Sequence, residues 1–121
     1  MEIDILVVDD CATTRKIVSY MVKSGGYNPV LAVNGLDALE KMAQHQIALI
    51  VTDLNMPQMD GFELVKNVKE SPETSSIPVI MITTEGDELK KDAGLDVGVD
   101  IFMTKPVTSK WLTYQIKKLL P

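Results

Sequence analysis

The chain has little of what disulfide-stabilised, membrane-spanning or secreted proteins need. It contains one cysteine, Cys11, so no intramolecular disulfide can form, which fits a reducing compartment such as the cytoplasm. No apolar run approaches the length of a membrane span. The first residues, MEIDI, carry no basic segment of the kind that begins a signal peptide. We therefore expect a cytoplasmic protein without membrane insertion.

The chain also lacks an excess of basic residues. Twelve lysines and arginines stand against seventeen aspartates and glutamates, which gives a net charge of −5. Basic residues occur in short pairs such as Lys90-Lys91 and Lys117-Lys118 rather than in a cluster. Because a nucleic-acid-binding surface needs a basic patch, we expect no direct contact with nucleic acid.

What the chain does have is an alternation of strand-like and helix-like segments within one domain-sized length of 121 residues. Short apolar runs predict buried strands, and apolar residues at helical spacing predict helices between them. The predicted strands are 3–8, 29–33, 47–52, 77–83 and 99–103. The predicted helices lie around 17–22, 36–43, 62–68, 86–97 and 112–119. We expect one domain over residues 1–121.

Five β-α units predict a parallel sheet with helices on both faces. Nearly continuous apolar strands agree with burial of both faces of that sheet. We expect a three-layer α/β domain of the flavodoxin-like type, with strand order 2-1-3-4-5.

Polar residues follow the predicted strands where those strands end. The first strand runs into Asp9 and Asp10, the third into Asp53 and the fourth into Thr83, while Lys105 lies just beyond the fifth. Ligands of open parallel sheets bind beyond the carboxyl ends of the strands. We therefore expect these five side chains to share one site.

Three neighbouring carboxylates require a proton or a cation to balance their charge. Oxygen ligands without histidine or cysteine favour Mg²⁺ or Ca²⁺ over zinc. A calcium-binding EF-hand loop beginning at Asp53 is excluded, because its sixth and twelfth positions hold Gln58 and Leu64 instead of glycine and glutamate. Beside a metal, a carboxylate can act as a nucleophile and form an aspartyl phosphate, and Asp53 is the best candidate.

Each of these features has an ordinary structural explanation when it stands alone. An Asp-Asp pair more often caps a helix, and a threonine at a strand end more often has only a structural role. We expect Cys11 to pack rather than react, and His45 to be exposed. The combination of all the polar groups on one sheet edge favours the functional interpretation.

Four segments of the sequence, LVVDD, TDLNMPQMDG, MITTEGD and FMTKP, resemble in order and spacing the receiver domain of two-component response regulators. The resemblance covers essentially the whole chain and is closest to the single-domain CheY-like type. It implies that Asp53 accepts phosphate from a histidine kinase. It also implies that Asp10 and Asp53 bind Mg²⁺ directly, that Asp9 holds a metal-bound water, and that Asn55 offers its backbone carbonyl.

The resemblance further implies a switch. Thr83 would hydrogen-bond the phosphoryl group, Lys105 would pair with it, and the bond from Lys105 to Pro106 would be cis. Phe102 occupies the position of the switch aromatic, where the family often has tyrosine, and it lacks that hydroxyl. Phosphate would stabilise a minor conformer through differential contacts.

The surface that this switch would change consists of the fourth helix, the fifth strand and the fifth helix. A downstream protein target would contact it. The candidate contact residues are Lys91, Leu95, Phe102, Trp111 and Lys118. On the sequence alone, packing of Trp111 on the sheet is an equally good interpretation.

Three alternatives remain open from the sequence. The chain is a receiver fragment of a longer, for example DNA-binding, response regulator; or it is a phosphatase with an aspartyl intermediate; or it is a pseudo-receiver that only binds partners. The dehalogenase-type phosphatase needs a second acid two residues after the nucleophile, where this chain has Asn55. The full set of acids with Lys105 argues against a pseudo-receiver.

Overall fold

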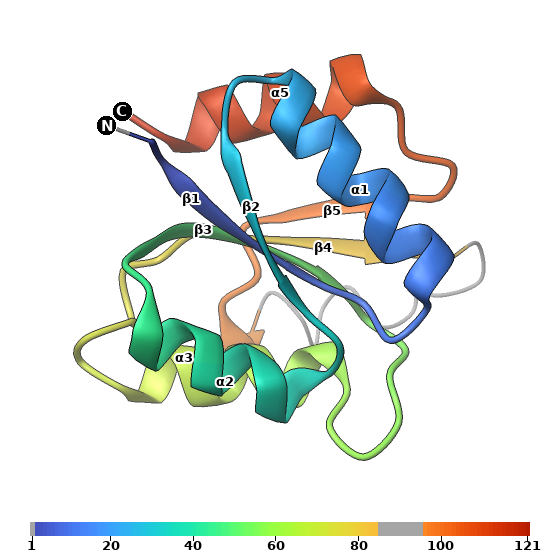
Figure 1. Cartoon of the computed structure of the whole chain (residues 1–121). Coiled ribbons are helices and arrows are strands. Elements are labelled where there is room, and N and C mark those ends of the chain that lie inside the picture. The colour runs from blue at the N-terminus through green and yellow to red at the C-terminus, as the bar shows by residue number, and fades with distance from the viewer. Residues whose placement is uncertain (1, 85–95) are drawn as a thin grey trace.

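A computed structural model of the chain describes residues 2–84 and 96–121 and contains a parallel sheet of five strands (Figure 1). The strand order is β2-β1-β3-β4-β5, which confirms the predicted topology. All four pairings of neighbouring strands are parallel. The strands are β1 (Asp4–Val8), β2 (Asn28–Ala32), β3 (Ile47–Asp53), β4 (Val79–Thr83) and β5 (Ile101–Thr104).

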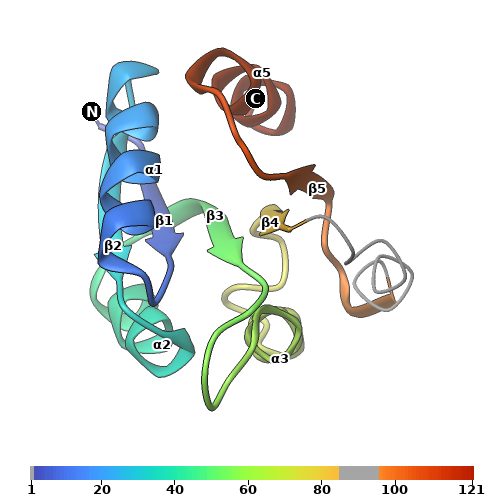
Figure 2. The ribbon, with the colours of Figure 1, turned by 90° about the vertical axis from the view of Figure 1, so that its right-hand side faces the viewer.

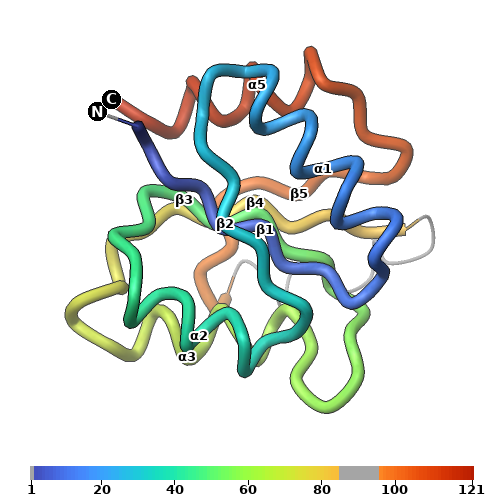
Figure 3. Tube along the Cα trace, in the orientation of Figure 1, coloured from blue at the N-terminus to red at the C-terminus, as the bar shows by residue number. Residues whose placement is uncertain are grey.

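Helices cover both faces of this sheet. Helices α1 and α5 lie on one face, and α2 and α3 lie on the other, as the ribbon and the trace both show (Figures 1 and 3). Their bounds are α1 (Ala12–Ser24), α2 (Gly35–Gln44), α3 (Gly61–Glu70) and α5 (Ser109–Leu119). The helix predicted over 86–97 falls almost wholly on residues outside the described part of the chain. In the described ranges, no helix has the length and apolarity needed to cross a membrane.

The sheet separates two apolar cores, and a central strand such as β1 contributes to both, because successive side chains point to opposite faces. On β1, Ile5 and Val7 join the core beneath α1 and α5. Leu6 and Val8 join the core beneath α2 and α3. All four side chains are at most 1% exposed. This burial explains why the strands read as continuous apolar runs.

The structure corrects several details of the sequence interpretation. Cys11 is exposed at the N-cap of α1, so the expectation that it packs is wrong. Ile17 and Leu36, the first apolar residues of two predicted helices, are 51% and 57% exposed. Asp53 is the last residue of β3 rather than the first of a loop. Strand β4 begins only at Val79, after Pro78, which has no N–H to offer the sheet.

The register places the polar strand ends at one edge of the sheet. Val8 of β1 lies opposite Thr52 of β3, and Thr83 of β4 lies opposite Thr104 of β5. Figure 2 looks toward this edge, where β1 and β3 end. The last residues of β3 and β4 and the residues just after β1 and β5 therefore lie at one edge of the sheet.

Candidate functional site

Three aspartates form the centre of the site. Carboxylate oxygens of Asp9, Asp10 and Asp53 lie within 4.8 Å of one another. Asp9 and Asp53 are buried, at 4% and 6% exposure, whereas Asp10 is exposed. Two of these residues follow β1 and the third ends β3, so the predicted convergence of distant chain segments occurs. The three carboxylates form an acid cluster that is open to solvent at Asp10.

Lys105 supplies a positive charge to this cluster. Its Nζ lies 3.3 Å from Oδ1 of Asp53, and its side chain is 32% exposed. Its backbone N–H donates to the Thr83 carbonyl at 2.8 Å, which fixes the segment after β5 against the end of β4. The peptide bond between Lys105 and Pro106 is cis. Asp53 is therefore the carboxylate of the cluster that lies against both the other acids and an ammonium group.

The electrostatics of the cluster disfavour its fully ionised form. Burial raises the pKa of Asp53 above its ordinary value of 3.8, and repulsion from Asp9 raises it further, while Lys105 opposes both. Burial also raises the pKa of Asp9, against the lowering effect of a hydrogen bond from the Cys11 N–H. A cation bound between these groups would replace the protons that they otherwise attract.

These raised pKa values predict how the stability of the metal-free protein depends on pH. A carboxyl with a raised folded-state pKa takes up its proton in the folded state first, so the free energy of unfolding should rise as pH falls from 7 toward 4. A tenfold difference in proton affinity between the folded and unfolded states corresponds to about 1.4 kcal/mol. Urea unfolding in EDTA should show this rise, and D53N should be more stable than wild type at pH 7.

The advantage of D53N over wild type should shrink as the pH approaches 4, since wild type then protonates Asp53. Asp37, whose pKa is lowered by a hydrogen bond from the Val33 N–H, is present in both proteins, so its contribution cancels in this difference. A constant difference between the two proteins from pH 7 to pH 4 would contradict the raised pKa of Asp53.

The chain between β3 and α3 begins at the site and is partly buried. Leu54 and Met56 in this segment are 2% and 8% exposed, so much of what sequence reasoning treats as a rim loop is core. The Gly61 N–H donates to the Leu54 carbonyl at 2.8 Å. A Cβ on Gly61 would lie 2.6 Å from the Asp53 carbonyl oxygen, so only glycine permits this approach.

The remaining predicted site residues take different positions. Thr83 is 1% exposed at the end of β4, on the strand next to Asp53. Asn55 is exposed, two residues beyond Asp53. Phe102 is half-buried and packs against the core that contains Met81. Lys91 and Leu95 lie outside the described residues.

Trp111 lies on the solvent side of α5, at 53% exposure, so the alternative that it packs on the sheet is wrong. It stacks on Tyr114, which is 58% exposed, with ring centroids 5.9 Å apart. Stacking of two neighbouring exposed rings keeps them ordered without burying them. Lys118 is also exposed on this helix.

Arg15 is a residue of this region that sequence reasoning missed. It lies in the first turns of α1, and its guanidinium donates to the backbone carbonyl of Asp9 at 2.8 Å. The Asp9 side chain also accepts from the Cys11 N–H at 2.9 Å. A basic residue near a helix start carries no signal in the sequence that would predict such a bond.

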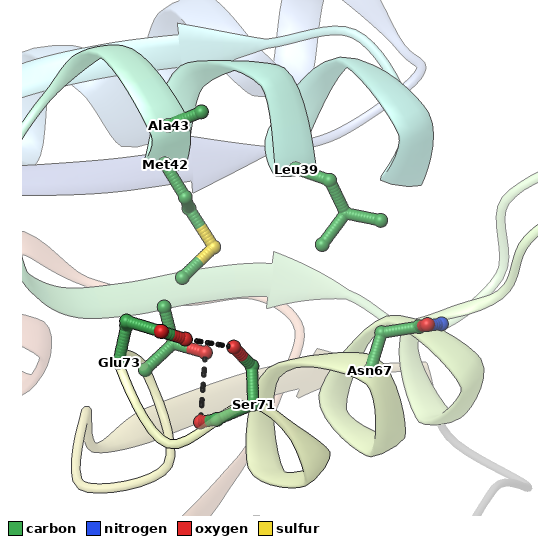
Figure 4. A pocket seen from close by; sticks show the side chains of 7 residues that line it. Leu39, Met42, Ala43, Asn67, Ser71 and Glu73 are labelled. Atoms are coloured by element: carbon green, nitrogen blue, oxygen red, sulfur yellow. Dashed lines mark hydrogen bonds between the residues drawn. The ribbon is translucent and has the colours of Figure 1, made fainter.

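A hollow elsewhere on the surface is separate from the acid cluster. It lies between α2 and α3, has a volume of about 270 Å³, and contains none of the three aspartates (Figure 4). Leu39 and Met42 form its apolar side, and Ser71 donates to Glu73 on the other at 2.6 Å. The chemistry that the sequence predicts therefore lies at the carboxyl edge of the sheet rather than in this hollow.

The donor set at the carboxyl edge fits Mg²⁺. The three aspartates offer only oxygen ligands, close enough to share one ion. Two of them are buried, and burial raises the pKa of both carboxyls, so a divalent cation would relieve an unfavourable concentration of charge. Asp10 remains open to solvent, which leaves room for the water ligands that Mg²⁺ keeps.

Comparisons with known proteins identify the family of the chain. Residues 5–117 match the family model of the response regulator receiver domain. The chain is 39% identical over 118 residues to the chemotaxis protein CheY1 of Helicobacter pylori, which covers 96% of this chain and 95% of that protein. It is similar in structure to the chemotaxis protein CheY4 of Vibrio cholerae, with a TM-score of 0.93 and 33% identity over 99% of this chain and 100% of that one.

A further solved structure is the signal receiver domain of a signal transduction histidine kinase from Syntrophus aciditrophicus. Its TM-score is 0.88 at 32% identity, over 97% of this chain and 89% of that one. Proteins of this family are switches of two-component signalling and bind Mg²⁺ at an acidic pocket. By its fold, its acid cluster and its match over residues 5–117, the chain belongs to the CheY-like response regulator receiver domains.

Proposed function

We propose that Asp53 accepts a phosphoryl group from the phosphohistidine of a histidine kinase, and that this changes the surface that a downstream protein contacts. The observation that carries the proposal is the position of Asp53 between two other carboxylates and the Lys105 ammonium, 3.3 Å away. A carboxylate in this setting is a nucleophile with positive charge already placed for the incoming phosphate.

The transfer balances without a further reactant. An Asp53 carboxylate oxygen forms a bond to phosphorus while the bond from phosphorus to the imidazole nitrogen breaks, and the imidazole takes the electron pair. Asp10 and Asp53 would bind Mg²⁺ directly, Asp9 would hold one of its waters, and the Asn55 carbonyl would complete the protein ligands. When bound, the ion supplies charge that offsets the phosphoryl oxygens.

Two other side chains complete the phosphate site. Lys105 is close enough to Asp53 to pair with a phosphoryl oxygen after transfer. Thr83 ends the strand next to β3 and brings a hydroxyl that can donate to the phosphoryl group. Transfer of this kind depends on positioning and charge rather than on proton chemistry, which is what these residues supply.

Labelling with a small phosphodonor tests the proposal. The protein is incubated with acetyl phosphate and Mg²⁺, the product is trapped by borohydride reduction, and the modified residue is located by peptide mass spectrometry. Modification at Asp53 that requires Mg²⁺ is expected. Modification at another residue, or none under saturating donor, would overturn the proposal.

The output surface is proposed to include Phe102 on β5 and the exposed side of α5, together with Lys91 and Leu95. Helix α5 carries Lys110, Lys117 and Lys118 and has no acidic residue. Its stacked Trp111 and Tyr114 lie among these lysines. In a chain of net charge −5, this basic and aromatic surface favours an acidic target with apolar anchors.

The single tryptophan offers a direct measurement of that change. Beryllofluoride with Mg²⁺, which mimics the phosphoryl group on an aspartate, is expected to shift the fluorescence of Trp111. The same addition to D53N should leave the emission unchanged, which separates the phosphate site from non-specific effects of fluoride. An unchanged wild-type spectrum at saturating beryllofluoride would contradict remodelling around Trp111.

A further inference from the structure

We infer that Arg15 is a positioning residue for the metal site: its guanidinium holds the backbone of Asp9 and thereby sets the place of Asp9 and Asp10. The inference rests on the proposed function, since it concerns the Mg²⁺ that the acid cluster would bind. It adds a residue on α1 to a site built from residues at strand ends. The bond that carries it runs from Arg15 Nη1 to the Asp9 carbonyl oxygen, at 2.8 Å.

The segment that Arg15 holds has few other restraints. Asp9 is the first residue after β1, and its N–H still donates to Ala32 of β2, at 3.2 Å. Its side chain accepts from the Cys11 N–H at 2.9 Å, which turns the chain toward α1. Between these two bonds, the Asp9 carbonyl belongs to the peptide unit that continues into Asp10. Because this peptide unit is planar, a fixed Asp9 carbonyl also fixes the orientation of the Asp10 backbone N–H, and with it the direction of the chain after β1.

Arg15 is itself held in place from both ends. Its backbone N–H donates to the Cys11 carbonyl at 2.9 Å, the first hydrogen bond of α1, and its side chain is half-buried. Its charge also acts on Asp37 at the start of α2, whose carboxylate accepts from the Val33 N–H at 2.9 Å and pairs with Lys41 at 3.1 Å. Arg15 is thus fixed by the first turn of α1 at its backbone and by the Asp9 carbonyl at its guanidinium.

The two effects of the guanidinium on a bound cation have opposite signs. Its positive charge repels Mg²⁺, so removal of the charge alone would tighten binding. Its hydrogen bond orders the carboxylates, so removal of that bond would weaken binding. Outer groups that orient metal ligands are typically worth roughly 10- to 100-fold in affinity. A charge that stays half-exposed is screened by solvent and acts more weakly. Positioning should therefore prevail.

Three variants separate these effects when Mg²⁺ affinity is measured by isothermal titration calorimetry. R15A loses the charge and the bond, and we expect roughly tenfold weaker Mg²⁺ binding. R15K keeps the positive charge but replaces the planar guanidinium by an ammonium group. We expect its Mg²⁺ affinity to fall as well, by a smaller factor than in R15A. K16A removes a neighbouring exposed charge from the same helix and should leave the affinity within about twofold of wild type.

A second readout distinguishes positioning from a general loss of stability. The amide resonance of Cys11, whose N–H bonds the Asp9 side chain, should shift in R15A without Mg²⁺, while the resonances of α5 should not. Equal or tighter Mg²⁺ binding by R15A would overturn the inference, as would equal weakening by K16A. If wild type binds no Mg²⁺ at all, the proposed function fails, and the inference about Arg15 fails with it.

Discussion

Replacement of Asp53 by asparagine is expected to abolish phosphorylation by acetyl phosphate, with labelling reduced by roughly a hundredfold or more. The amide has the size of the carboxylate but no charge, and it is a poor nucleophile toward phosphorus. Asp9 and Asp10 remain in D53N, so labelling of this variant also shows whether another acid of the cluster can accept phosphate in place of Asp53. We expect that neither can, because Lys105 pairs with Asp53.

A matched control lies at the other end of the same loop. Asp60 is the N-cap of α3 and accepts from the Glu63 N–H at 2.9 Å. Asparagine caps a helix as well as aspartate does, so D60N should fold normally and retain wild-type labelling. Labelling of D53N at the wild-type rate would show that the phosphoacceptor lies elsewhere.

Mg²⁺ is expected to stabilise the wild-type protein strongly, and loss of Asp10 should remove about half of that effect or more. A ligand that binds only the folded state adds about 2.7 kcal/mol at about one hundred times its dissociation constant. In D10N, the cluster keeps two carboxylates but loses the one that is open to solvent, so Mg²⁺ should bind at least roughly tenfold more weakly. Thermal unfolding at increasing Mg²⁺ concentration, against an EDTA reference, measures both effects.

Asp4 provides the control for D10N. It lies at the opposite end of β1, where its carboxylate accepts from Asn28 at 2.8 Å, far from the acid cluster along the strand. D4N should lower the melting temperature equally with and without Mg²⁺, and its Mg²⁺-dependent gain should equal that of wild type. A full Mg²⁺ effect in D10N would exclude Asp10 as a ligand.

The parallel sheet could be predicted from the sequence because the strands read as nearly unbroken apolar runs, and its order is a common one for five β-α units. The edge that carries the site could be predicted for a related reason. Charged residues such as Asp9 and Asp53 at the ends of such runs are costly to bury, and their combination at one edge of the sheet is best explained by a shared function. The topology then brings them together without any knowledge of side-chain geometry.

The orientations and hydrogen bonds of individual side chains could not be predicted from the sequence. Whether Trp111 faces the sheet or solvent depends on the rotation of α5, which the spacing of Leu112 and Ile116 leaves undetermined by about one residue. The position of Cys11 just after a buried strand predicts packing, but the chain turns outward there to begin α1. The hydrogen bond of Arg15 depends on where a backbone carbonyl points, and no residue pattern records that.

A crystal structure of the protein with Mg²⁺ and beryllofluoride would show whether the distant carboxylates share one ion. We expect one ion between the carboxylates of Asp10 and Asp53, with beryllofluoride on Asp53 within reach of Lys105 and Thr83. Carboxylates of Asp10 and Asp53 that point away from each other, with no ion between them, would contradict it.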